Sequence, residues 1–153
     1  MDVSQYRLAS ADTVWRYEFS GTLEPGAVAV VYGSESHTWE QISGNPAYGL
    51  RLANGGGKIT LWKLEGDTMS LVDCYTYADH EAEDDRSSGR FPDGDDLWVL
   101  FDAHNPYSGD EEPQGSDCTP TPGGTATCAT PVEETSWGKV KTLWLTAAAG
   151  NPR

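Results

Sequence analysis

The chain has 153 residues and a formal net charge of −14, with ten Lys and Arg against 24 Asp and Glu. This length fits one domain with its own hydrophobic core. The few, scattered cations argue against nucleic acid as a ligand and against an anionic membrane surface, since both are held by clustered Lys and Arg. No apolar run reaches the roughly 18 residues that a membrane-spanning helix needs, so no membrane insertion is expected.

The first third of the chain predicts short strands. Val3–Ala9 and Thr13–Phe19 alternate between apolar and polar residues, as strands with one buried face do. Ala27–Tyr32 is a continuous apolar run, AVAVVY, and predicts a strand that is buried on both faces. Gly33–Tyr48 is polar and rich in turn residues, which indicates an ordered loop or a short helical turn.

The middle of the chain predicts hairpins. A glycine-rich turn is expected to join strands at Leu50–Ala53 and Lys58–Leu64. Glu65–Asp67 forms the next turn, and Met69–Tyr77 the strand that follows it. A last strand is expected at Leu97–Phe101, after a long acidic loop and a proline–glycine turn. The pattern as a whole predicts an all-β fold, a small antiparallel sandwich.

Residues 2–109 resemble the lamin tail domain family, which occurs in nuclear lamins and in many bacterial secreted or surface proteins. The segments that carry the resemblance are DVSQYRLAS, LEPGAVAVVYG, YGLRLANGGGKITLW, SLVDCYTY and SSGRFPDGDDLWVLF. The resemblance implies an immunoglobulin-like β-sandwich over residues 1–109. The first one or two strands of the family have no counterpart here, so an unpaired sheet edge and an uncovered patch of core are expected.

The cysteines indicate an oxidising compartment. Cys118 and Cys128 flank a Thr/Pro/Gly-rich sequence within the extended segment 110–131, and a disulfide between them is expected. Closing this loop would stabilise the fold by at most about 3 kcal/mol in the chain-entropy model. Cys74 lies in an apolar strand and is predicted to be a buried free thiol. These features predict an extracellular or cell-surface location.

Apolar residues return in segment 132–146, which we expect to dock onto a protein surface, whereas 147–153 is expected to fray. A helical period fits this segment somewhat better than an added strand, and both remain open. The residues of this period are Trp137, Val140, Leu143 and Trp144.

Clustered carboxylates form the best candidate binding site, because Ca²⁺ takes six to eight oxygen ligands. Their spacing does not match an EF-hand, so a solvated loop is the alternative. His80, beside two of them, is a weak candidate ligand for a divalent ion. The candidate calcium ligands are Asp79, Glu81, Glu83, Asp84, Asp85, Asp93, Asp95 and Asp96.

The sequence contains no recognisable catalytic motif, and apart from this possible calcium no cofactor is expected. The function expected from these features is that of a non-catalytic interaction or assembly module of a bacterial extracellular protein. Its partner would be a protein, either a different one or a second copy of this chain, held by the sheet edge and by segment 132–146. The alternative is an accessory calcium- or ligand-binding domain of a larger secreted hydrolase.

Overall fold

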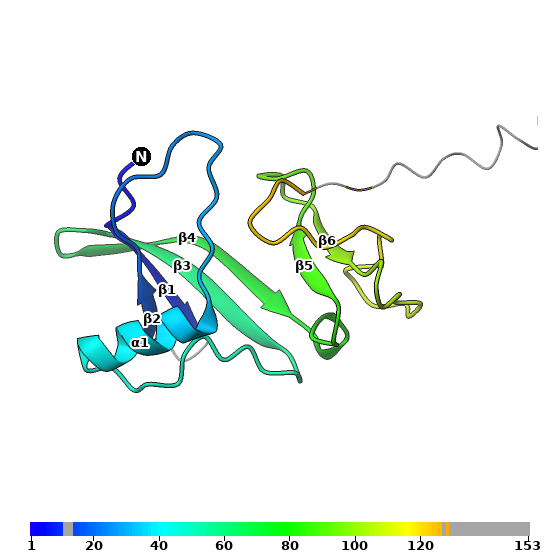
Figure 1. The fold of residues 1–153 in the computed structure, drawn as a ribbon, viewed down its shortest axis with the longest axis horizontal. Helices are drawn as coiled ribbons and strands as arrows, with labels where there is room; N and C mark the ends of the chain where they lie inside the picture. Colours follow the sequence, from blue (N-terminus) through cyan, green and yellow to red (C-terminus); the bar gives the residue numbers. More distant parts are fainter. Residues whose placement is uncertain (11–13, 127, 129–153) are drawn as a thin grey trace, which may run out of the picture.

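The computed structural model describes residues 1–10, 14–126 and 128. They form two antiparallel sheets and one α-helix, which confirms the predicted predominance of β-structure (Figure 1). One sheet has four strands in the order β2-β1-β3-β4, and the other pairs β5 with β6. The elements are β1 (Tyr6–Ser10), β2 (Trp15–Glu18), α1 (Gly33–Ser43), β3 (Gly57–Glu65), β4 (Thr68–Tyr77), the 3₁₀-helix η1 (Asp79–Glu81), β5 (Ser87–Arg90) and β6 (Trp98–Phe101).

The hairpin of β3 and β4 contains the two longest strands of the larger sheet. Its two-residue loop contains Gly66, whose φ of 61° belongs to the left-handed region that glycine adopts without strain. β1 adds to the other side of β3, with Leu8 opposite Leu61 and Ala9 opposite Thr60. Because side chains alternate between faces, Leu8 and Leu61 share one face with Ile59, and Ala9 and Thr60 lie on the other.

Two predicted strands are wrong. Ala27–Tyr32 is extended but pairs with no strand, and five of its six residues are exposed. Leu50–Ala53 is likewise not a strand, because β3 pairs with β1 and β4 instead. Both segments have suitable residues, but a strand also needs a neighbour to take up its backbone hydrogen bonds.

Where the sequence indicated a loop or a single helical turn, the structure has the 11-residue helix α1. Its anchors come from far away in the chain. The Ser36 hydroxyl donates to the Arg16 carbonyl over 2.6 Å, and the Glu40 carboxylate pairs with the Arg16 guanidinium at 2.9 Å. Gly44 ends the helix in the left-handed conformation.

The three cysteines divide into one pair and one free thiol. Cys118 and Cys128 form the predicted disulfide, with their Cα atoms 4.6 Å apart. Cys74 is free, as predicted, but it is exposed rather than buried. The reason is its position on the edge strand β4, where Asp73 and Tyr75 are half-buried on one face and Cys74 points to the other, exposed face.

Few apolar side chains are fully buried within the described residues. Ala9, Leu100, Phe101 and Cys118 form this set. Polar and charged residues outnumber them in the interior: Arg16, Ser36, Glu40, Thr60, His80, Glu81 and Asp102. The fold therefore depends strongly on hydrogen bonds and ion pairs that satisfy these buried groups.

The two sheets meet at their facing aromatic side chains. Tyr75 of β4 stacks on Trp98 of β6 with 3.6 Å between ring centroids. Beside them, Arg90 of β5 pairs with Asp73 of β4 at 2.8 Å.

No helix in the described part of the chain is long and apolar enough to cross a membrane.

Candidate functional site

The outer edge of β4 is the most distinctive surface of the described residues. β4 is ten residues long and ends the sheet, so one side of its backbone has no strand partner. Met69, Leu71 and Val72 follow one another along this edge with exposed fractions of 52, 49 and 48%. Val72 is the extra residue of a β-bulge, because Leu71 and Asp73 pair with consecutive residues of β3. A long apolar edge strand is a template for a further strand.

The face of the four-stranded sheet that is turned toward β5 and β6 is only partly covered. Leu8, Ile59 and Leu61 lie on this face and are all half-buried rather than buried. A cavity of about 120 Å³ separates them from Trp98. A second hollow of about 340 Å³ continues from Leu61 toward the N-terminal residues and the exposed segment that begins at Ala27. The apolar face thus has room for additional side chains.

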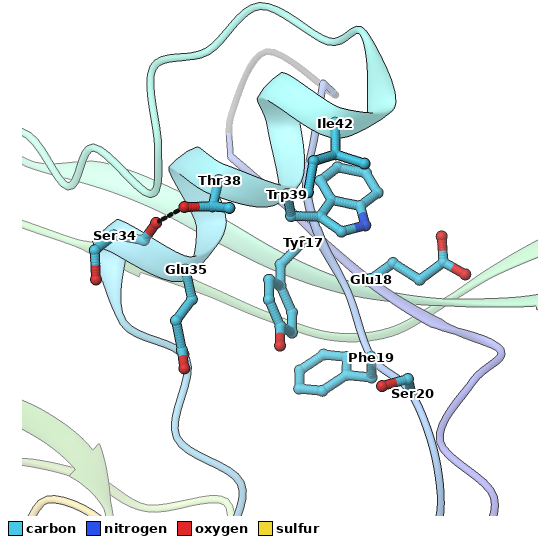
Figure 2. Close-up of a pocket in the computed structure, with 9 residues that line it drawn as sticks. All are labelled: Tyr17, Glu18, Phe19, Ser20, Ser34, Glu35, Thr38, Trp39 and Ile42. Carbon is cyan, nitrogen blue, oxygen red and sulfur yellow. Dashed lines mark hydrogen bonds between the residues drawn. The ribbon is translucent and has the colours of Figure 1, made fainter.

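A pocket of about 530 Å³ lies where α1 crosses β2 (Figure 2). Trp39 of the helix faces Tyr17 and Phe19, whose rings contact each other edge to face at 5.3 Å. The two carboxylates at its rim already have partners. Glu18 pairs with an arginine of β1 at 2.7 Å, and Glu35 accepts a backbone N–H at the start of the helix. What remains open is an aromatic surface for an apolar or flat group.

A buried carboxylate joins β4, η1 and β5. Glu81 accepts hydrogen bonds from the Tyr75 and Ser88 hydroxyls and from the Ala78 N–H, the last at 2.8 Å. Burial, together with the hydrogen bond to Glu81, raises the pKa of the Tyr75 phenol above its ordinary value. All three donors point at one acceptor, so the cluster fixes the three elements relative to one another.

The predicted calcium ligands are dispersed. Glu81 is engaged as just described, Asp96 pairs with Arg90 at 3.2 Å, and Asp93 accepts the Ala126 N–H at 3.0 Å. Asp79 has a different neighbourhood: its carboxylate, the His80 imidazole and the Glu111 carboxylate place ligand atoms within 4.8 Å of one another. In the described part of the chain this is the one group of three such residues, and it contains none of the other predicted ligands. Calcium binding stays a prediction.

His80 was noted from the sequence only as a weak ligand, and Glu111 was missed. Glu111 is 31 positions further along the chain, in the segment after β6, so no spacing motif connects it to His80. Burial of His80 distinguishes this place, but the burial of an isolated histidine cannot be read from the sequence. The predicted interaction residues Trp137, Val140, Leu143 and Trp144 lie outside the described residues.

The segment after β6 is held by Asp102. Its carboxylate is buried and accepts the backbone N–H groups of Tyr107, Ser116 and Asp117 at 2.8–3.0 Å. Gly115 passes so close that a Cβ there would collide with this carboxylate. Together with the disulfide, these bonds order a segment that has little apolar content of its own.

Comparison with protein-family models, with curated proteins and with solved structures finds no match to this chain. The lamin tail resemblance therefore stays a hypothesis that rests on the sequence segments alone.

Proposed function

We propose that this chain is a non-catalytic protein-interaction module, an immunoglobulin-like sandwich related to lamin tail domains, which associates by strand addition at the edge of β4. The observation that carries the proposal is the ten-residue edge strand, in which all residues from Thr68 to Val72 are exposed and three of them, Met69, Leu71 and Val72, are large and apolar. In strand addition the free backbone groups supply hydrogen bonds, and side chains on alternate positions supply specificity.

The occupant that we propose is segment Ser136–Leu145 of a second copy, which lies outside the described residues. It contains two lysines and no acidic residue, so its charge is opposite to the net charge of −14 of the whole chain. Trp137 and Trp144 are its largest apolar side chains, and the partly covered sheet face has hollows beside Leu61 for such groups.

We propose that the segment is donated to a neighbouring copy, and closure within one chain is the alternative that the solution mass tests. Cys128 is tied by its disulfide to the segment after β6, and nearby Ala126 donates its N–H to Asp93 in the turn between β5 and β6. Met69, Leu71 and Val72 lie in the half of β4 that is nearer the β3–β4 turn. Exchange between copies would produce a dimer or a longer assembly.

An extracellular or cell-surface location is part of the proposal. The disulfide between Cys118 and Cys128 supports it, because such bonds persist mainly in oxidising compartments. The acidic surface fits a protein partner and not a nucleic acid.

The test is the solution mass, measured by light scattering over a concentration series. The full chain is expected to associate, and a chain that ends at residue 135 is expected to be a monomer. Leu71→Lys places a charge in the middle of the proposed interface and should weaken association at least about tenfold, a cost of about 1.4 kcal/mol or more. A synthetic peptide of residues 132–146 should bind the shortened chain.

Ile42→Lys is the matched control, because Ile42 is 82% exposed, equally apolar and located on α1, away from β4. Its association should equal that of the unchanged chain. A full chain that stays monomeric at the highest concentration would overturn the proposal and favour closure within one molecule. Association that Leu71→Lys leaves intact would also overturn it, because the interface would then lie elsewhere.

A further inference from the structure

The surroundings of His80 contain a polar atom without a hydrogen bond. Only 8% of the His80 side chain is exposed. Its Nε2 atom lies 3.4 Å from the Pro113 carbonyl oxygen, which can only accept, so Nε2 carries a proton there. The other ring nitrogen, Nδ1, has no hydrogen bond. Among the described residues it is the one buried side-chain nitrogen or oxygen without a hydrogen-bond partner. In the neutral ring Nδ1 presents a lone pair.

That lone pair faces a carboxylate. Glu111 Oε2 lies 3.4 Å from Nδ1, and an oxygen of the Asp79 carboxylate completes a group of three ligand atoms within 4.8 Å of one another. A lone pair and a carboxylate oxygen repel each other at this distance unless a positive charge lies between them. Either a proton on Nδ1 or a metal cation supplies that charge.

We propose that Asp79, His80 and Glu111 form a binding site for a divalent transition-metal ion of the zinc type. In a tetrahedral zinc site, metal–ligand distances of about 2.0–2.1 Å place neighbouring ligand atoms roughly 3.3 Å apart. The separation of 3.4 Å between His80 Nδ1 and Glu111 Oε2 already has this value. Asp79 is exposed; its Oδ1 accepts the His80 backbone N–H at 2.8 Å, and its other carboxylate oxygen is left to close the remaining gap. Water completes the coordination.

The ring of His80 is oriented before any ion arrives. Nε2–H donates to the Pro113 carbonyl, and a backbone carbonyl is a common hydrogen-bond acceptor for the second ring nitrogen of a metal-bound imidazole. Tyr107 stacks on the ring at 4.5 Å between centroids, and Arg86 binds the His80 carbonyl at 2.8 Å. Arg86 also binds the Asn105 carbonyl at 2.7 Å and so ties η1 to the segment that carries Glu111.

The donor set selects the kind of ion. Imidazole nitrogen suits zinc and its transition-metal neighbours, whereas calcium takes oxygen ligands and would leave Nδ1 uncoordinated. Three protein ligands, two of them on exposed side chains, also leave positions for water. None of these three residues belongs to the exposed part of β4, so a test of metal binding is independent of a test of the proposed assembly.

The first test is a calorimetric titration of the full chain with Zn²⁺. The second follows the ring-nitrogen resonances of the histidines by NMR while Zn²⁺ is added, at a mildly alkaline pH where ordinary imidazoles are neutral. Zn²⁺ is expected to shift the Nδ1 resonance of His80 and to leave Nε2 protonated. His80→Ala and Glu111→Gln should each weaken zinc binding at least about tenfold. Ca²⁺ should not move the His80 resonances.

Two control variants match these changes. Asp110→Asn removes a neighbouring carboxylate outside the group, and His104→Ala removes an exposed histidine; both should bind Zn²⁺ as the unchanged chain does. Glu111 is 72% exposed, so Glu111→Gln keeps the test valid if His80→Ala fails to fold. Equal zinc affinity in Glu111→Gln and the unchanged chain would overturn the proposal as adventitious binding. A proton on His80 Nδ1 that persists with excess Zn²⁺ would overturn it as well.

Discussion

Two regions of the molecule can be compared. The first is the four-stranded sheet with α1, and the second is the β5–β6 sheet with the segment that follows it. Each is stabilised by a buried carboxylate, but the two carboxylates have different partners. Glu40 fixes α1 through an arginine, with Glu40 completely buried and the Arg16 side chain 5% exposed. Asp102 fixes the segment after β6 through backbone N–H groups alone. The first region depends on an ion pair between distant elements, and the second on a local cage of amides closed by a disulfide.

The two regions differ in how suited they are to receiving a further strand. In the second region the Asp102 carboxylate satisfies three backbone N–H groups, and the apolar residues Leu100 and Phe101 of β6 are buried. The four-stranded sheet is anchored at its β2 side by α1, whereas its β4 side keeps a free edge and exposed apolar side chains. Polar anchoring at one side thus allows the other to remain open without loss of the fold.

The largest expected effect comes from breaking the ion pair. Glu40→Ala leaves the Arg16 guanidinium buried without its carboxylate and should lower the free energy of unfolding by about 4 kcal/mol. Urea unfolding followed by tryptophan fluorescence measures this loss. The double variant Arg16→Met/Glu40→Leu should lose less than Glu40→Ala, because no unpaired charge remains. An equal or larger loss in the double variant would contradict the assigned role.

A somewhat smaller loss is expected at the amide cage. Asp102→Ala leaves three backbone N–H groups without an acceptor, and some of them will reach water, so the cost should be about 3 kcal/mol. Hydrogen exchange should speed up between residues 103 and 118 and not in α1, and Glu40→Ala should show the opposite pattern. Exchange that increases equally in both regions would show that they unfold as one unit. Asp110→Asn, at an exposed site, should change stability by less than about 0.5 kcal/mol.

The smallest effect concerns Tyr75, which connects the two regions. Burial and the bond to Glu81 raise its pKa in the folded state, so its contribution is complete below about pH 10, the ordinary value for tyrosine. Above that pH the unfolded chain loses the proton first, and stability falls as pH rises toward the folded-state pKa. Tyr75→Phe should cost about 1 kcal/mol at neutral pH and should lose stability less steeply in alkali. Urea unfolding from neutral to alkaline pH measures both; identical slopes would contradict the raised pKa.

Sequence patterns located the elements that are specified locally. The β3–β4 hairpin follows from Gly66 and its two alternating flanks, and the disulfide from two cysteines in a segment without a packing reason for them. The strand predicted at Ala27–Tyr32 does not form, because an apolar run shows that residues can form a strand but not that a partner strand exists. The sequence of α1 indicated only a loop or a single helical turn. Its helix is stabilised by Arg16, which lies 24 positions from Glu40, and a local pattern does not contain such a distant contact.

The candidate sites divide in the same way. The apolar character of β4 is a property of its sequence, but its exposure depends on β4 being the last strand of the sheet. His80 and Asp79 are neighbours in the chain, whereas Glu111 reaches them only because Arg86 and Asp102 fold the segment after β6 back onto η1. Local hydrogen-bonding preferences and side-chain periodicity determined the class of fold from the sequence. Edges, burial and the meeting of distant side chains were decided by the tertiary structure, because they depend on which surfaces find a partner.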